Sequence, residues 1–236
     1  MTNLPCFLSY IWLTAVTSLF FSAHCTVMET YLPLFPLNLV AFPGETLNLH
    51  VFEDRYKELI GDCLEQNAPF GLPAYVENQI EYGTEVTVTK VVERYDDGRL
   101  DISTRATRAF RVISFDNPTA GKLYAGGEVV FLENEYDADS HSRPEMIELI
   151  QELFSVISMV DRVEVAEDIT SFDVAHKIGL SLDQKYALLQ LERESERQMV
   201  IIQHLRSTIP VLREMEETKE RIRMNGHFRK YDPLDF

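Results

Sequence analysis

The sequence predicts an α+β protein with a β-rich module at residues 28–136 and a helical subdomain at residues 137–236. Two observations favour this division. Short segments rich in β-branched residues and ending at turn residues fill the first part, whereas the second part repeats apolar residues at three- and four-residue steps. The pattern changes at a polar linker, residues 137–142. An apolar, leader-like segment, residues 1–27, precedes both parts.

Two strands and a helix are expected at the start of the β-rich module. Residues 32–39 are apolar but contain Pro33 and Pro36, which favours an edge strand. Residues 46–52 alternate apolar and polar side chains, the period of a half-buried strand. A helix then begins at a capping Asp54, has its apolar face on Tyr56, Leu59, Ile60, Cys63 and Leu64, and ends at Asn67 and Pro69.

The rest of the module is predicted to be sheet. Residues 85–95 read as a strand that enters a hairpin turn at residues 96–98. The strands expected after the turn are residues 100–104, 110–115 and 128–132, with the Gly126–Gly127 pair as a bulge or turn before the last.

Capping residues divide the second part into helices. Pro144 opens an apolar repeat through Met146, Leu149, Leu153 and Val160. Thr170 or Ser171 caps a short helix ending at Gly179, and Ser181 with Gln184 forms a capping box for the next. Ser195 with Gln198 repeats the box before a long helix that is interrupted near Pro210 and ends at residues 225–226. Its arginines, on a face expected to be solvated, with a docking face as the alternative, are Arg193, Arg197, Arg206, Arg213, Arg221 and Arg223.

Charge and motif content exclude several classes of function. A formal net charge of −16 disfavours nucleic acid as a partner, although solubility alone also explains it. Gly121–Lys122 is followed by leucine, so no phosphate-binding loop is present, and the histidines show no metal-ligand spacing. No nucleophile motif of the Gly-x-Ser-x-Gly type occurs. We therefore expect neither a cofactor nor a metal.

The leader-like segment has two interpretations. Residues 7–23 are one apolar run of signal-peptide length, but no Lys or Arg precedes it. Met28 is therefore favoured as the true start, with a cytoplasmic protein that does not contact a membrane; export or membrane tethering is the alternative. Cys6 and Cys25 lie in this segment, so Cys63 is the cysteine of the remainder, where its helical position favours core packing in a reducing compartment.

Short motifs in chain order carry a family resemblance: LPLFPL at residues 32–37, FPG at 42–44, LHVFEDRY at 49–56, FG at 70–71, YGT at 82–84 and DGR at 97–99. They resemble the Lon substrate-binding domain, over about residues 31–228. The chain departs from that family at Ala106, where glycine is usual, and near Ala109, where a second arginine is usual. The resemblance implies a PUA-like β module, a pseudo-barrel with one helix, followed by a helical bundle.

The resemblance also implies a function. A complete Lon protease carries an ATPase domain and a serine–lysine peptidase domain after this region, and the chain shows neither. A non-catalytic module that binds unfolded or client polypeptides, and serves a protease or chaperone, is therefore expected. The alternatives are a small-molecule-binding or enzymatic protein on a PUA-like fold, and an exported or membrane-tethered holdase.

An extended client can pair along a sheet edge while exposed aromatic or basic side chains select it. The candidate contacts are Phe42, Phe52, Arg55, Tyr56, Phe70 and Arg99. Aromatic residues at such positions are more often core, and Arg99 at a hairpin tip is also explained by turn structure alone.

Overall fold

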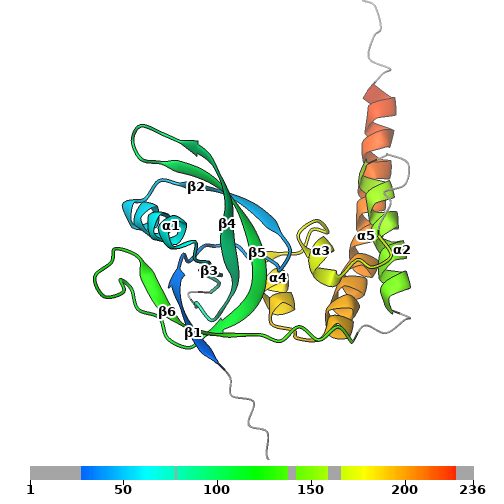
Figure 1. The fold of residues 1–236 in the computed structure, drawn as a ribbon. Coiled ribbons are helices and arrows are strands. Elements are labelled where there is room, and N and C mark those ends of the chain that lie inside the picture. Colours follow the sequence, from blue (N-terminus) through cyan, green and yellow to red (C-terminus); the bar gives the residue numbers. More distant parts are fainter. Residues whose placement is uncertain (1–27, 78, 138–141, 159–165, 227–236) are drawn as a thin grey trace, which may run out of the picture.

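The α+β fold is confirmed in a computed structural model that describes residues 28–77, 79–137, 142–158 and 166–226. The two interpretations of residues 1–27 and the prediction for Val160 lie outside this part of the chain. Figure 1 shows strands around one side of the molecule and helices beside them. The strands are β1 (Glu29–Leu34), β2 (Thr46–Val51), β3 (Phe70–Pro73), β4 (Tyr82–Arg94), β5 (Leu100–Val112) and β6 (Ala125–Phe131). The helices are α1 (Asp54–Gln66), α2 (Ser142–Ser158), α3 (Ser171–Ala175), α4 (Leu182–Leu189) and α5 (Glu194–Gly226).

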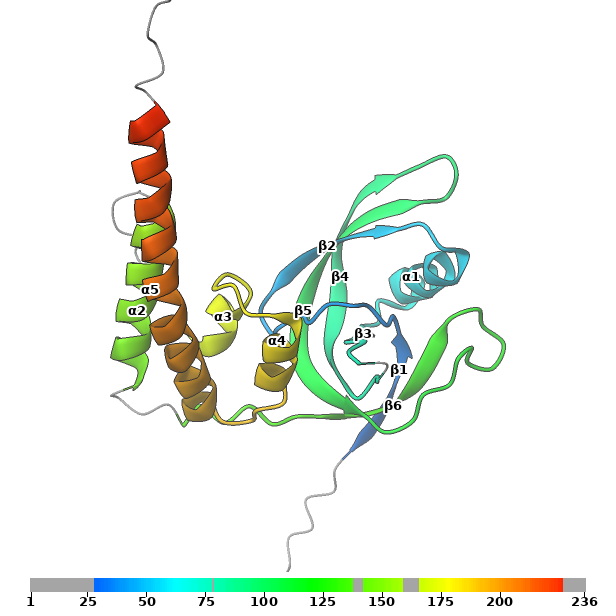
Figure 2. The ribbon, with the colours of Figure 1, turned by 180° about the vertical axis from the view of Figure 1, so that it is seen from behind.

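The strands form one sheet in the order β2-β5-β4-β3-β1-β6, and an additional β5–β6 pairing closes β5, β4, β3, β1 and β6 into a ring. β2 lies outside the ring and pairs with β5. All pairings are antiparallel except the short parallel contact of β1 with β3. α1 covers one side of this arrangement in both views (Figures 1 and 2).

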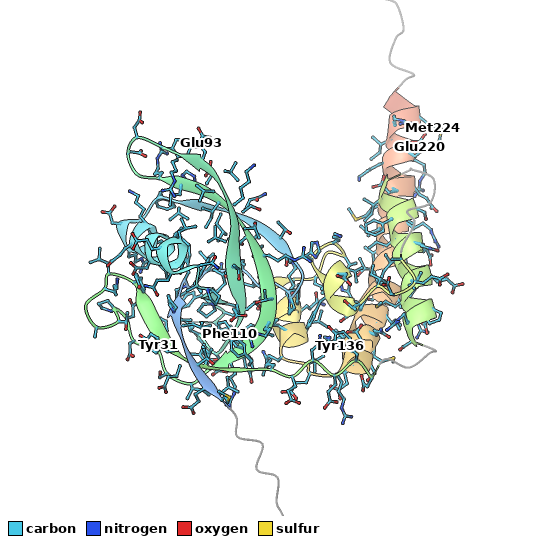
Figure 3. The ribbon with its side chains drawn as sticks, viewed as in Figure 1. Tyr31, Glu93, Phe110, Tyr136, Glu220 and Met224 are labelled. Carbon is cyan, nitrogen blue, oxygen red and sulfur yellow. The ribbon has the colours of Figure 1, made fainter. Side chains whose placement is uncertain are left out.

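Glycines allow the interior of the ring to close around Phe110. Phe110 is fully buried, and Figure 3 shows it within the ring of strands. A Cβ at Gly71 would lie 2.9 Å from the Phe110 ring, and a Cβ at Gly83 would lie 2.5 Å from the Leu72 carbonyl oxygen. The glycines of the FG and YGT motifs are therefore required by close approach of neighbouring strands.

The helical part shares its core with the β module. The Phe42 ring stacks on the Phe172 ring of α3, with centroids 5.5 Å apart. This core cluster also contains Ala109 of β5 and the inward faces of α2 and α5, which lie side by side in both views (Figures 1 and 2). The helices therefore bury apolar surface against the sheet as well as against one another.

Several predicted strand features are corrected by the structure. β1 lies between β3 and β6 and is not an edge strand, although it reaches β3 only at Leu34. The segments predicted at 100–104 and 110–115 are one strand, because residues 105–109 also pair with β4. The Gly126–Gly127 pair lies inside β6, where a Cβ at Gly127 would overlap the carbonyl oxygen of Ser114. β3 was not predicted.

The predicted helix starts are confirmed in part. Ser181 and Gln184 form their capping box, and Thr170 caps α3. Glu53, rather than Asp54, is the N-cap of α1. α5 begins at Glu194 and runs through Pro210, so the interruption is not present. The capping box predicted for Ser195 is also absent: the Asp137 carboxylate accepts hydrogen bonds from both the backbone amide and the hydroxyl of Ser195.

Arg197 lies in the core rather than on a solvated face, which corrects another prediction. Its side chain is 1% exposed and pairs with the fully buried Glu194 at 2.8 Å. The Arg197 guanidinium also donates to the hydroxyl of Ser171, to the carbonyls of Leu191 and Glu192, and to Asn134. These bonds satisfy the buried charge and join α3 to the start of α5.

Candidate functional site

β2 offers a sheet edge to an incoming chain. It ends the strand order and, among the described residues, has β5 as its one strand partner. Its inner side chains, Leu47 and Leu49, pack against the core cluster beneath α1, whereas Thr46, Asn48 and His50 are exposed. β2 is therefore anchored on one face and one side, and its other side is a strand edge.

The ladder shows which amides point to that edge. The Ala106 amide donates to the Glu45 carbonyl, and the Ala106 carbonyl accepts from the Gly44 amide. Residues of an antiparallel strand face alternate neighbours, so Thr104, two positions away and opposite Leu47, also faces β2. The backbone groups of Thr46, Asn48 and His50 consequently point away from β5 and are directed to the edge of β2.

An aromatic cluster lies at the carboxyl end of this edge. Phe52 is 58% exposed, and its ring stacks on the His50 ring at a centroid distance of 6.0 Å. The His50 ring meets the edge of the Tyr95 ring at 6.1 Å, and the Arg99 guanidinium lies 4.9 Å from the Tyr95 centroid. We call His50, Phe52, Tyr95 and Arg99 the hairpin surface, because the β4–β5 hairpin supplies the last two.

Asp101 fixes the orientation of the cluster. One of its carboxylate oxygens lies 2.6 Å from His50 Nδ1, and the other accepts a 2.7 Å hydrogen bond from the Tyr95 hydroxyl. The bonds from His50 and Tyr95 lower the pKa of Asp101 below its ordinary value, and the bond to Asp101 is the main reason that the pKa of Tyr95 rises to about 12. Both rings are thus held in place on an otherwise exposed surface.

The structure leaves three of the predicted contacts at the surface, of which Phe52 and Arg99 share one aromatic cluster, and it buries the other three. Phe52 and Arg99 belong to the hairpin surface, and Arg55 follows shortly after Phe52, where its guanidinium pairs with Glu53. Phe42, Tyr56 and Phe70 lie in the core, so the prediction that they contact a client at the surface is wrong. Phe42 fills the joint with α3, and Tyr56 stacks on Phe35 at 3.7 Å. Their apolar area is used by folding rather than by a partner.

No motif in the sequence marks His50, Tyr95 and Asp101 as one group. His50 and Asp101 occupy opposite positions in the β2–β5 ladder, so only the strand register makes them neighbours. Within the described ranges, no group of three or more His, Cys, Asp or Glu side chains is arranged to hold a metal ion. In the same ranges no helix is both long and apolar enough to cross a membrane.

Comparisons with known proteins agree with this fold. The family model described as the ATP-dependent protease La (LON) substrate-binding domain matches residues 31–207. A Lon N-terminal domain protein from Xanthomonas campestris has a solved structure with a TM-score of 0.56 and 29% identity, covering 72% of this chain and 95% of that one. The N-terminal domain of Mycobacterium avium complex Lon protease gives a TM-score of 0.56 at 16% identity, covering 75% and 98%, which supports the fold alone.

A curated relative places a similar segment in a longer protein. The LON peptidase N-terminal domain and RING finger protein C14F5.10c of Schizosaccharomyces pombe is 23% identical over 224 residues. The match covers 74% of this chain but 44% of that protein, so the chain spans less than half the length of this relative.

Proposed function

The chain belongs to the Lon substrate-binding domain family, and on this premise we propose that it binds unfolded polypeptide segments without catalysing a reaction on them. The bound segment adds to β2 as a further strand. The observation that supports this most directly is the β2 edge, whose outward amides end beside the exposed Phe52 ring. Main-chain hydrogen bonds provide affinity for any extended segment, and the hairpin surface adds side-chain contacts.

Binding by strand addition does not require a particular client sequence. The backbone of Thr46, Asn48 and His50 would bond to main-chain N–H and C=O groups, which every polypeptide has. A folded client has already paired most of its own main-chain groups. Phe52 and Tyr95 provide aromatic contact area for apolar side chains, which folded proteins keep buried. We therefore expect preference for unfolded over folded chains, and we propose that the complex delivers the client to a protease or chaperone.

The first test compares two states of one client. A labelled client protein would be titrated with the full chain and its fluorescence anisotropy measured, without ATP or metal. The client would be used once reduced and alkylated, and once in its native, disulfide-bonded form. Preferential binding of the unfolded form is expected. Equal binding of both forms, or of neither, would contradict the proposal.

A second test isolates the β2 edge. Asn48→Pro removes an amide that points away from β5, so the β2–β5 ladder is retained while an edge donor is lost. Loss of one such bond costs about 1 kcal/mol, which weakens binding roughly fivefold. Asn48→Thr keeps the amide and is the matched control. Circular dichroism and the midpoint of thermal unfolding verify that both variants fold; unchanged binding by a folded Asn48→Pro variant would exclude strand addition at β2.

A further inference from the structure

Gly61 lies in the middle of α1, although nothing in the described structure requires glycine there. A Cβ built at this position has no heavy atom within 4 Å outside its own helix backbone and chain neighbours, and the backbone has ordinary helical dihedrals. Glycine in a helix interior is less stable than alanine because its backbone loses more conformational freedom on folding. The position therefore carries a cost to stability that packing within the chain does not offset.

The open space above Gly61 is a groove of about 340 Å³ between α1 and the β4–β5 hairpin. Leu64 of α1 and Leu100 of β5 give it apolar walls, and Tyr95 connects it to the hairpin surface. Lys57 closes one end, because its ammonium group contacts the Asp97 carbonyl oxygen at 3.4 Å. Figure 1 shows the hairpin extending from the ring on the side where α1 lies.

The charge at the groove favours an acidic occupant. Lys57 and Arg94 line it together with one acid, Glu65. Lys57 is paired with Asp54 at 3.2 Å, whereas the exposed side chain of Arg94 has no ion pair or hydrogen bond to any described residue. A carboxylate beside Arg94 would supply the missing partner.

We propose that this groove holds a client segment whose main chain passes directly over Gly61, with an apolar side chain between Leu64 and Leu100 and an acidic side chain beside Arg94. The inference rests on the proposed function and adds a preference to it: clients that combine apolar and acidic residues bind more tightly than clients that combine apolar and basic residues. Gly61 is then explained by close approach of the bound chain, since any side chain there would occupy its path.

Substitution of Gly61 separates binding from folding. Gly61→Ala and Gly61→Gln replace glycine with good helix formers that point into open space, so each is expected to raise the midpoint of thermal unfolding, by roughly 2–4 °C for alanine. Binding of the reduced and alkylated client should weaken by at least about fivefold for alanine and further for glutamine, as the groove is filled. Gln66→Ala, at an exposed position of α1 outside the groove, is the control and should bind as the unaltered chain does.

Two labelled, unstructured peptides test the charge preference. One combines Leu and Phe with Asp and Glu, and the other replaces each acid with Lys. The unaltered chain is expected to prefer the acidic peptide, and Arg94→Gln to reduce that preference. If the unaltered chain binds unfolded client but both Gly61 variants bind equally well, the groove assignment is wrong and the proposed function stands. If the unaltered chain binds no unfolded client, both fail.

Discussion

His50 and Asp101 lie opposite each other in the β2–β5 ladder, and the His50 imidazole contacts the Asp101 carboxylate through Nδ1 at 2.6 Å. The contact joins the strand with the available edge to the hairpin that carries Tyr95 and Arg99. Because Tyr95 also donates to Asp101, one half-buried carboxylate orients two rings of the hairpin surface.

The first prediction concerns the acid dependence of this group. The pKa of Asp101 is lowered from an ordinary value of 3.8, first by the bond to His50 and then by the bond from Tyr95. Because the pKa is lower in the folded state, the ionised carboxylate contributes stability at pH values above the pKa of the unfolded state. This contribution is lost as the pH falls below 3.8 and through the pKa of the folded state. Tyr95→Phe should therefore raise the pKa of Asp101, measured by carbon NMR of the carboxyl group.

Tyr95 provides the complementary measurement. Asp101→Asn removes the carboxylate that most strongly raises the pKa of Tyr95, so that pKa should fall from about 12 toward its ordinary value of 10.0. Carbon NMR of the Tyr95 ring during alkaline titration, assigned with Tyr95→Phe, would show the change. Titration of Tyr95 near 10.0 in the unaltered chain would contradict the observed hydrogen bond.

The second prediction concerns the buried pair of Arg197 and Glu194. Arg197→Ala would leave Glu194 buried without its charged partner, and the free energy of unfolding should fall by about 3–5 kcal/mol. Arg206→Ala is a matched control on the same helix, since Arg206 pairs with Glu145 at the surface, where the loss should remain below about 1 kcal/mol. Urea unfolding followed by circular dichroism gives both values. Similar small losses would show that the Arg197 pair contributes little.

The third prediction concerns the reactivity of Cys63. Burial, followed by the nearby Asp62 charge, raises the pKa of the Cys63 thiol to about 11, so little thiolate is present at neutral pH. Iodoacetamide should modify Cys63 slowly in the folded chain and rapidly in urea, as quantified by mass spectrometry of its peptide. Rapid modification under native conditions would indicate that α1 opens easily or that the thiol is functional.

The β-rich half could be predicted from local patterns because its turns and alternating segments are locally specified. β2 and α1 follow their side-chain periods closely, and Asn67 ends α1 in the left-handed conformation. β5 could not be read as one strand, because residues 105–109 lack a strand-like composition. In the structure, the Arg108 guanidinium and the Thr107 hydroxyl both donate to Glu85 of β4, which compensates for that composition.

Long-range contacts explain the remaining differences. The start of α5 is capped by Asp137, which is distant in sequence from Ser195, so the residues next to Ser195 predict a capping box that does not form. Burial could not be assigned to individual aromatic residues either: Phe42 and Phe52 both follow apolar segments, but only Phe42 meets α3. The hairpin surface itself depends on the β2–β5 register, which no single segment specifies.

The ring of strands also determines an order of events during synthesis. β1 pairs along its whole length with β6, and Leu34 is opposite Ala125. The ring can therefore close only after the residues between these two strands have left the ribosome. The β4–β5 hairpin involves residues that are close in sequence and can form earlier. We expect β1 to remain unpaired, and therefore available to chaperones, until β6 emerges during translation. In that interval the protein itself exposes an unpaired segment, as an unfolded client does.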